Sequence, residues 1–88
     1  MRTGFNRKFY KDLDILQDAK DRAAVKKTIK EVEAAKKVQD IPGLKKLTGF
    51  KNAYRIRCGD YRIGVFIEKG TVEFARLAHR KDIYKVFP

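Results

Sequence analysis

The sequence predicts an α+β domain in which two N-terminal helices pack on one face of an antiparallel sheet of three to four strands. Residues 6–38 repeat apolar side chains three and four positions apart, which is the spacing of one helix face. Residues 54–78 alternate apolar and polar side chains, as half-buried strands do. The segment 40–43, with proline and glycine, separates the two halves. A chain of 88 residues has room for one such domain, 1–88, and not for two cores.

Two helices are expected before residue 40. The first begins near Asn6, a residue type that accepts a backbone hydrogen bond at helix starts, and the second runs from about Asp21 to Val38. Residues 17–20 form the break between them. Four alanines raise the helix propensity of the second segment. The apolar stripes are Phe9, Leu13 and Leu16 in the first helix and Val25, Ile29 and Val32 in the second.

Three strands are expected in the second half, over about 54–58, 61–67 and 72–78. Gly59-Asp60 is a two-residue turn signal, with glycine where a type II′ turn requires it, and Lys69-Gly70 marks a second turn. Residues 1–5 are a candidate further strand, although Gly4 weakens the pattern.

A two-residue turn at 59–60 fixes the register of the first two strands. One face of this hairpin is then apolar and packs on the helices, while the other carries three arginines beside the open space left by Gly64. Continuing the alternation through the second turn adds residues of the last strand to this arginine face. The expected partners are Cys58 with Tyr61, Arg57 with Arg62, Ile56 with Ile63 and Arg55 with Gly64, and the added residues are Glu73, Ala75, Leu77 and His79.

Net charge is the most informative part of the composition. The chain has 22 Lys and Arg against 11 Asp and Glu, a formal net charge of +11 and a pI near 10.0. This excess predicts an anionic partner, with nucleic acid first, a membrane surface second and an acidic protein as another alternative. Neither helix pattern has the broad apolar face of a membrane-surface helix, so no membrane partner is expected.

The chain has one cysteine, Cys58, and one histidine, His79. A single thiol builds neither a disulfide framework nor a cysteine-based zinc site. No metal site and no other cofactor are therefore expected. The single thiol and the charged N-terminal segment favour a reducing, cytoplasmic location.

The expected pairing of Arg57 with Arg62 places like charges opposite each other, with Arg55 two residues away. Such a pair destabilises a sheet, and conflicts of this kind tend to fall at functional sites. An anion between the guanidinium groups would remove the conflict, because their planar donors match phosphate oxygens. The alternative is an exposed strand whose arginines are solvated or paired with Glu73.

A second polar group, His79, Arg80 and Tyr84, follows the last strand. Histidine and tyrosine exchange protons, and tyrosine also stacks on bases; the alternatives are a strand-end cap for His79 and tail packing for Tyr84. RNA cleavage requires activation of the 2′-hydroxyl, charge stabilisation at phosphorus and a proton for the leaving oxygen. These residue types supply all three, whereas no carboxylate cluster supports a two-metal nuclease. The sequence therefore predicts a metal-independent ribonuclease.

Four segments carry a family resemblance: YRIRCGDYRI at 54–63, AHRKDIY at 78–84, FYKDL at 9–13 and LKKLTG at 44–49. Together they resemble the RelE/ParE superfamily of toxins from bacterial and archaeal toxin–antitoxin systems. The resemblance implies a microbial RNase-like fold with two helices on a curved antiparallel sheet. For RelE-type members it implies cleavage of messenger RNA in the ribosomal A site, which inhibits translation. It also implies a cognate antitoxin that blocks the site, and contact with operator DNA only through that antitoxin.

The resemblance also assigns roles to single residues. Because arginine rarely loses its proton, His79 and Tyr84 are the predicted proton-transfer groups, His79 replacing a different basic residue of some members. Lys51, just before the hairpin, is a further predicted RNA-binding residue. The remaining roles are RNA-backbone binding by Arg55 and Arg57, transition-state stabilisation by Arg62, leaving-group assistance by Arg80, and base stacking or 2′-hydroxyl activation by Tyr84.

Two other functions fit parts of the sequence. A ParE-like toxin would inhibit DNA gyrase and cleave no RNA, and the joint presence of Arg62, Arg80 and Tyr84 argues against it. A non-catalytic nucleic-acid-binding module would keep the basic face and tolerate loss of His79 and Tyr84.

Overall fold

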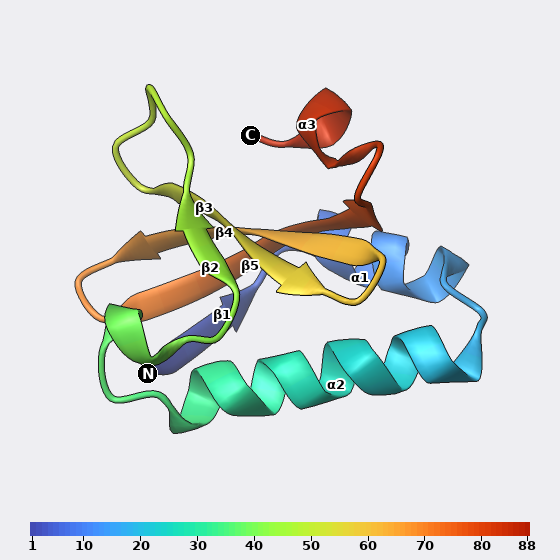
Figure 1. Cartoon of the computed structure of the whole chain (residues 1–88), viewed down its shortest axis with the longest axis horizontal. Coiled ribbons are helices and arrows are strands. Elements are labelled where there is room, and N and C mark those ends of the chain that lie inside the picture. Colours follow the sequence, from blue (N-terminus) through green and yellow to red (C-terminus); the bar gives the residue numbers. More distant parts are fainter.

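The computed structural model describes residues 1–88 and contains one five-stranded sheet with three helices. Figure 1 shows α2 along one side of the sheet and α3, with the loop between β2 and β3, on the other side. The α+β class and the packing of N-terminal helices on one sheet face are confirmed. In chain order the elements are β1 (Arg2–Phe5), α1 (Arg7–Ile15), α2 (Ala19–Ala34), a 3₁₀ turn (Val38–Asp40), β2 (Leu44–Lys46), β3 (Ala53–Cys58), β4 (Tyr61–Glu68), β5 (Thr71–His79) and α3 (Ile83–Val86).

Side-chain caps set the starts of both long helices. The side chain of Asn6 accepts a hydrogen bond from the Lys8 N–H, as the sequence predicts, and Asp18 accepts from the N–H groups of Lys20 and Asp21. Because Asp18 is the cap, α2 begins two residues before the predicted Asp21. It also ends at Ala34 rather than at the predicted Val38, because the backbone becomes extended at Ala35.

The sheet has the order β1-β5-β4-β3-β2 and is mixed. The predicted N-terminal strand is present, but β1 pairs in parallel with β5, so the expectation of a wholly antiparallel sheet is wrong. The strand β2 is an addition that the sequence analysis did not contain. It has only three residues, too few for an alternating pattern, and it pairs antiparallel with β3.

The β3–β4 hairpin has the predicted register. Cys58 pairs with Tyr61, Arg57 with Arg62, and Arg55 with Gly64. The alternate residues of this hairpin lie in the main core with both long helices. The fully buried members of that core include Phe9, Val25, Val32, Ile56, Ile63, Val65, Val72 and Phe74.

The pairing of β4 with β5 differs from the prediction after its first half. Val65 pairs with Phe74, the pairing that unbroken alternation through the 69–70 turn predicts. Gly64, however, pairs with Arg76, so Ala75 is an extra residue in a β-bulge. The bulge reverses the side-chain alternation beyond it. Leu77 therefore lies in the helix-facing core, and His79 lies opposite Tyr61 rather than on the arginine face. Glu73 and Ala75, which precede the reversal, remain on the predicted side.

A second, smaller apolar cluster lies on the arginine side of the sheet, where α3 and the C-terminal tail pack. Its buried members are Leu47, Ala53, Ala75, Ile83 and Phe87. The ring of Phe87 lies directly over Gly64, and a Cβ on that glycine would overlap the ring. The prediction of open space at Gly64 is therefore wrong, since the absence of a side chain there makes room for Phe87.

Candidate functional site

Four arginines gather where the β3–β4 hairpin meets the end of β5. Arg57 and Arg62 pair across the two strands, and Arg55 lies two residues from Arg57 on the same face of β3. The Arg80 N–H donates a 2.8 Å hydrogen bond to the Asp60 carbonyl in the hairpin turn. That bond brings the segment after β5 to the same end of the sheet.

The pKa of the Arg62 guanidinium reflects its basic surroundings. Burial, followed by repulsion from Arg55, Arg57 and Arg80, lowers the pKa of the Arg62 guanidinium, while Tyr84 acts in the opposite direction. The ion pairs of the structure are Asp12 with Arg76 and Asp82 with Lys85. None of the four clustered arginines pairs with a carboxylate, Glu73 included. This end of the sheet therefore carries a positive charge that no acidic side chain neutralises.

Backbone carbonyl groups hold two of the four guanidinium groups. Arg55 Nη1 donates to the Gly43 carbonyl at 2.9 Å, and Arg62 Nη1 donates to the carbonyls of Gly59 and Tyr61, each at 2.9 Å. Arg57 is exposed and makes no such bond. Arg55 and Arg62 are thus fixed in place, and Arg57 is free to reach a ligand.

Tyr84 is placed by α3, which the second apolar cluster fastens to the sheet. The preceding residue, Ile83, is fully buried in that cluster, whereas Tyr84 is 62% exposed. An exposed tyrosine that is anchored through its neighbour presents its ring and hydroxyl to solvent at a defined position. Because α3 packs against β4, the strand that carries Arg62, Tyr84 and the arginine cluster lie on the same side of the sheet.

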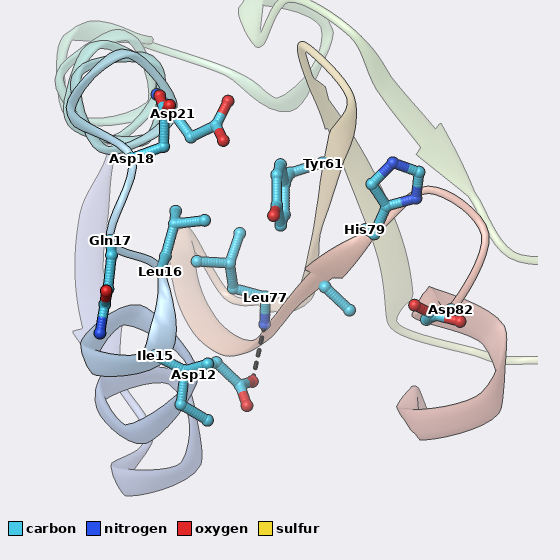
Figure 2. A pocket seen from close by; sticks show the side chains of 11 residues that line it. Asp12, Ile15, Leu16, Gln17, Asp18, Asp21, Tyr61, Leu77, His79 and Asp82 are labelled. Atoms are coloured by element: carbon cyan, nitrogen blue, oxygen red, sulfur yellow. Dashed lines mark hydrogen bonds between the residues drawn. The ribbon is translucent and has the colours of Figure 1, made fainter.

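His79 lies elsewhere. Its ring contacts Tyr61 edge to face, with centroids 5.6 Å apart, on the helix-facing side of β5. Figure 2 shows both rings in a pocket of about 340 Å³, with Asp18 and Asp21 on the side of the helices. His79 Nδ1 accepts a hydrogen bond of 3.2 Å from the Lys81 N–H, so the imidazole orders the turn that carries Arg80.

Lys51 lies exposed in the loop between β2 and β3, on the same side of the sheet as α3 (Figure 1). The loop begins at Leu47, which packs in the cluster that contains Ile83 and Phe87. The loop and α3 are therefore anchored in the same apolar cluster, on the arginine side of the sheet.

An ion pair that the sequence analysis missed supports this site. Asp12, in α1, accepts two hydrogen bonds from Arg76 in β5, at 2.8 Å and 3.2 Å, and a third from the Leu77 N–H at 2.9 Å. The hydrogen bonds raise the pKa of the Arg76 guanidinium. The Asp12 carboxylate thus replaces a strand partner where β1 has ended. The sequence does contain a sign of the bulge that positions Arg76 for this ion pair. The spacing between apolar residues changes from two, between Val72 and Phe74, to three, between Phe74 and Leu77.

Cys58 has a structural place. It is buried in the main core, where the Thr28 hydroxyl lies 3.4 Å from its Sγ atom. Burial raises the pKa of the thiol, which lowers the fraction of reactive thiolate. No three histidine, cysteine or acidic side chains are grouped as metal ligands, and no helix is both long and apolar enough to cross a bilayer.

Comparisons with known proteins agree with this fold. The family model for the ParE toxin of type II toxin–antitoxin systems matches residues 5–84. Toxin RelE3 from Methanocaldococcus jannaschii is 38% identical over 89 residues, covering 100% of both chains. The structure resembles a RelB–RelE antitoxin–toxin complex from Methanococcus jannaschii, with a TM-score of 0.78 and 37% identity over 97% of this chain and 99% of that one. A RelE–RelB complex from Pyrococcus horikoshii shares the fold at a TM-score of 0.71 and 21% identity, over 93% of this chain and 97% of that one.

These matches span the helices, the hairpin and the C-terminal segment that together build the arginine cluster. The fold and the site define a small basic toxin of the RelE type. The chain belongs to the RelE/ParE superfamily of toxins from type II toxin–antitoxin systems.

Proposed function

We propose that this toxin is a metal-independent endoribonuclease that cleaves messenger RNA in the ribosomal A site and so inhibits translation. The observation that carries the proposal is the group of four arginines without carboxylate partners, which lies beside the exposed Tyr84. A surface that only binds nucleic acid needs positive charge. A surface that cleaves RNA also needs a group that exchanges protons next to the bound phosphate, and Tyr84 fits that need.

In the proposed reaction the 2′-oxygen attacks phosphorus and the bond to the 5′-oxygen breaks. The products are a 2′,3′-cyclic phosphate and a 5′-hydroxyl. Arg62 stabilises the charge that develops on the phosphoryl oxygens, and Arg80 assists the leaving oxygen. The 2′-hydroxyl loses a proton as it attacks and the 5′-oxygen gains one as it leaves, and Tyr84, which also stacks on the nucleotide, passes these protons to and from water. Arg55, Arg57 and Lys51 bind the RNA backbone, which is the role that the sequence analysis gives them.

We assign His79 a positioning role within this proposal. The expectation that it transfers a proton rested on the chemistry of imidazole and on its predicted place on the arginine face, and the bulge puts it on the other side of β5. Its hydrogen bond to the Lys81 N–H supports a role through the turn that carries Arg80.

The proposed protein partner is a cognate antitoxin. Similar toxins from Methanococcus jannaschii and Pyrococcus horikoshii were solved together with RelB. An antitoxin that covers the arginine face would block RNA, and operator DNA would be bound through the antitoxin. Because the proposed substrate is messenger RNA on the ribosome, we place the toxin in the cytoplasm.

The test uses ribosomes programmed with a defined message and the purified toxin. The expected result is a discrete cut within the A-site codon whose upstream fragment ends in a 2′,3′-cyclic phosphate. The same message without ribosomes should be cut far more slowly, since the ribosome holds the RNA in place. An intact message, while expression of the toxin still arrests growth, would contradict the proposal. A DNA-gyrase supercoiling assay would then test the ParE-like alternative.

A further inference from the structure

One exposed aromatic residue on the arginine side of the sheet has no part in the mechanism above. Phe50 is 49% exposed in the loop between β2 and β3, next to Lys51. The larger exposed apolar side chains are Tyr10, Ile15, Phe50 and Tyr84, and α3 carries the last of them. Figure 1 shows this loop and α3 rising from the same side of the sheet. The loop that contains Phe50 and the helix that contains Tyr84 thus project from the same side of the sheet.

The loop is shaped by its own hydrogen bonds. The Leu47 N–H donates to the Ala53 carbonyl at 2.9 Å, and the Phe50 N–H donates to the Leu47 carbonyl at 3.4 Å. Gly49 adopts a φ of 86°, a conformation that residues with a side chain rarely adopt. Leu47 is buried against α3 and the tail, so the base of the loop is fixed. Phe50 is therefore held out at a defined place rather than left on a loose loop.

The surroundings of Phe50 are basic. Residues 41–59 contain five Lys or Arg residues and no Asp or Glu. Lys46 and Lys51 flank the loop, and Lys45 pairs with Arg55 across β2 and β3, which joins the loop to the arginine cluster. Residues 46–50, Phe50 among them, line an open hollow of about 380 Å³. A protruding aromatic ring among lysines is the arrangement by which proteins stack on the bases of single-stranded RNA.

We propose that Phe50 stacks on a nucleobase to one side of the scissile step, and so helps to determine which codons this toxin cuts. The inference rests on the proposed ribonuclease function and extends it to base selection. Phe50 binds substrate and takes no part in proton transfer, because a phenylalanine has no group that ionises or donates. Loss of its ring should therefore weaken RNA binding while the chemical step, once RNA is bound, stays unchanged.

The test compares Phe50→Ala, Phe50→Leu and Phe50→Trp in the ribosome-programmed cleavage assay. Stacking on a base predicts that Phe50→Trp keeps wild-type behaviour, while Phe50→Leu and Phe50→Ala raise KM by about 5- to 100-fold at an unchanged kcat. The two non-aromatic variants should also redistribute the cuts among codons. Ile15→Ala is the matched control, because Ile15 is 77% exposed at the end of α1 and should leave KM and cut sites unchanged. Equal urea midpoints would show that all variants fold.

Three other outcomes overturn the inference. If Phe50→Leu cuts like wild type, an aromatic face is not required. If Phe50→Ala keeps its KM and cut sites but is no longer neutralised by the antitoxin, the loop binds a protein instead. If wild type itself cuts no message, the proposed function fails and this inference fails with it, which separates that result from a failure confined to the Phe50 variants.

Discussion

Asp12 shows how one side chain supports a site that it does not enter. Its carboxylate accepts two hydrogen bonds from Arg76 and one from the Leu77 N–H, and it is largely buried. A backbone donor and a guanidinium both lose their acceptor when this group is removed. Charged hydrogen bonds of this kind contribute more to stability than neutral ones.

We expect Asp12→Ala to lower the free energy of unfolding by about 1.5–3 kcal/mol. Urea unfolding followed by circular dichroism measures the change. Asp14→Ala is the matched control, because Asp14 lies exposed on the same helix without an ion pair. Equal losses for the two variants would show that the ion pair does not stabilise the fold.

Replacing Tyr84 and replacing His79 should slow the chemical step to different extents. We expect Tyr84→Phe to reduce single-turnover cleavage by about 10²-fold, because it removes a group that exchanges a proton. His79→Ala should reduce it only several-fold, through disorder of the turn before α3. The informative measurement is the rate as a function of pH.

A positioning residue leaves the shape of the pH–rate profile unchanged when it is replaced. If one limb of the profile disappears in His79→Ala, the imidazole transfers a proton, and the original expectation from the sequence would be restored.

The placement of these residues also shows what the sequence could predict. Arg57 opposite Arg62 followed from a two-residue turn, which is local information, and the register is confirmed. The position of His79 depended on counting along β5 through Ala75, where the bulge adds one residue. Alternation alone does not locate a bulge, because it is stabilised by contacts with other elements. Here Ala75 packs in the second apolar cluster, and the Asp12 carboxylate accepts a hydrogen bond from the Leu77 N–H.

Among the elements, α3 and the tail most directly shape the site. Phe87 occupies the space above Gly64 and lies 5.0 Å from the ring of Phe66, and Ile83 fixes the helix that carries Tyr84. A four-residue helix has no periodic pattern of its own, so the sequence analysis gave only tail packing as an alternative for this segment. The same limit applied to β2, and the parallel pairing of β1 depends on a partner distant in sequence.

We expect Gly64→Ala to destabilise the fold by about 1–3 kcal/mol, because the new methyl group overlaps the Phe87 ring. The Phe87→Ala variant opens that space, so Gly64→Ala should cost much less in the Phe87→Ala background. A double-mutant cycle by urea unfolding measures this coupling. Additive effects would show that the tail does not cover Gly64 in solution.

Over the whole molecule, charge is distributed unevenly. Four aspartates line the pocket beside His79, while the arginine cluster and the loop between β2 and β3 carry no acidic partner. A net charge of +11 could have been spread over the surface for solubility. The cluster of arginines without acidic partners on one side of the sheet favours a polyanion that binds there.

The salt dependence of binding reports how many phosphates are contacted. For a single-stranded oligoribonucleotide, Arg57→Ala should make the slope of log K against log salt concentration shallower by about 0.7. Lys27→Ala removes the same charge from the exposed face of α2 and should leave the slope unchanged. Fluorescence anisotropy at several salt concentrations gives both slopes. Equal slopes for the two variants would mean that the arginine face does not contact RNA phosphates.

The central claim is that the arginine cluster cleaves messenger RNA. Its most direct test is the single-turnover rate of A-site cleavage, followed by primer extension, for wild type beside Arg62→Ala and Lys27→Ala at matched occupancy of the ribosome. We predict discrete cuts for wild type and Lys27→Ala, and a loss of about 10²-fold or more for Arg62→Ala, because one oriented donor to the transition state contributes that much. Cleavage by Arg62→Ala at the wild-type rate would contradict the claim and place the chemistry on another face of the protein.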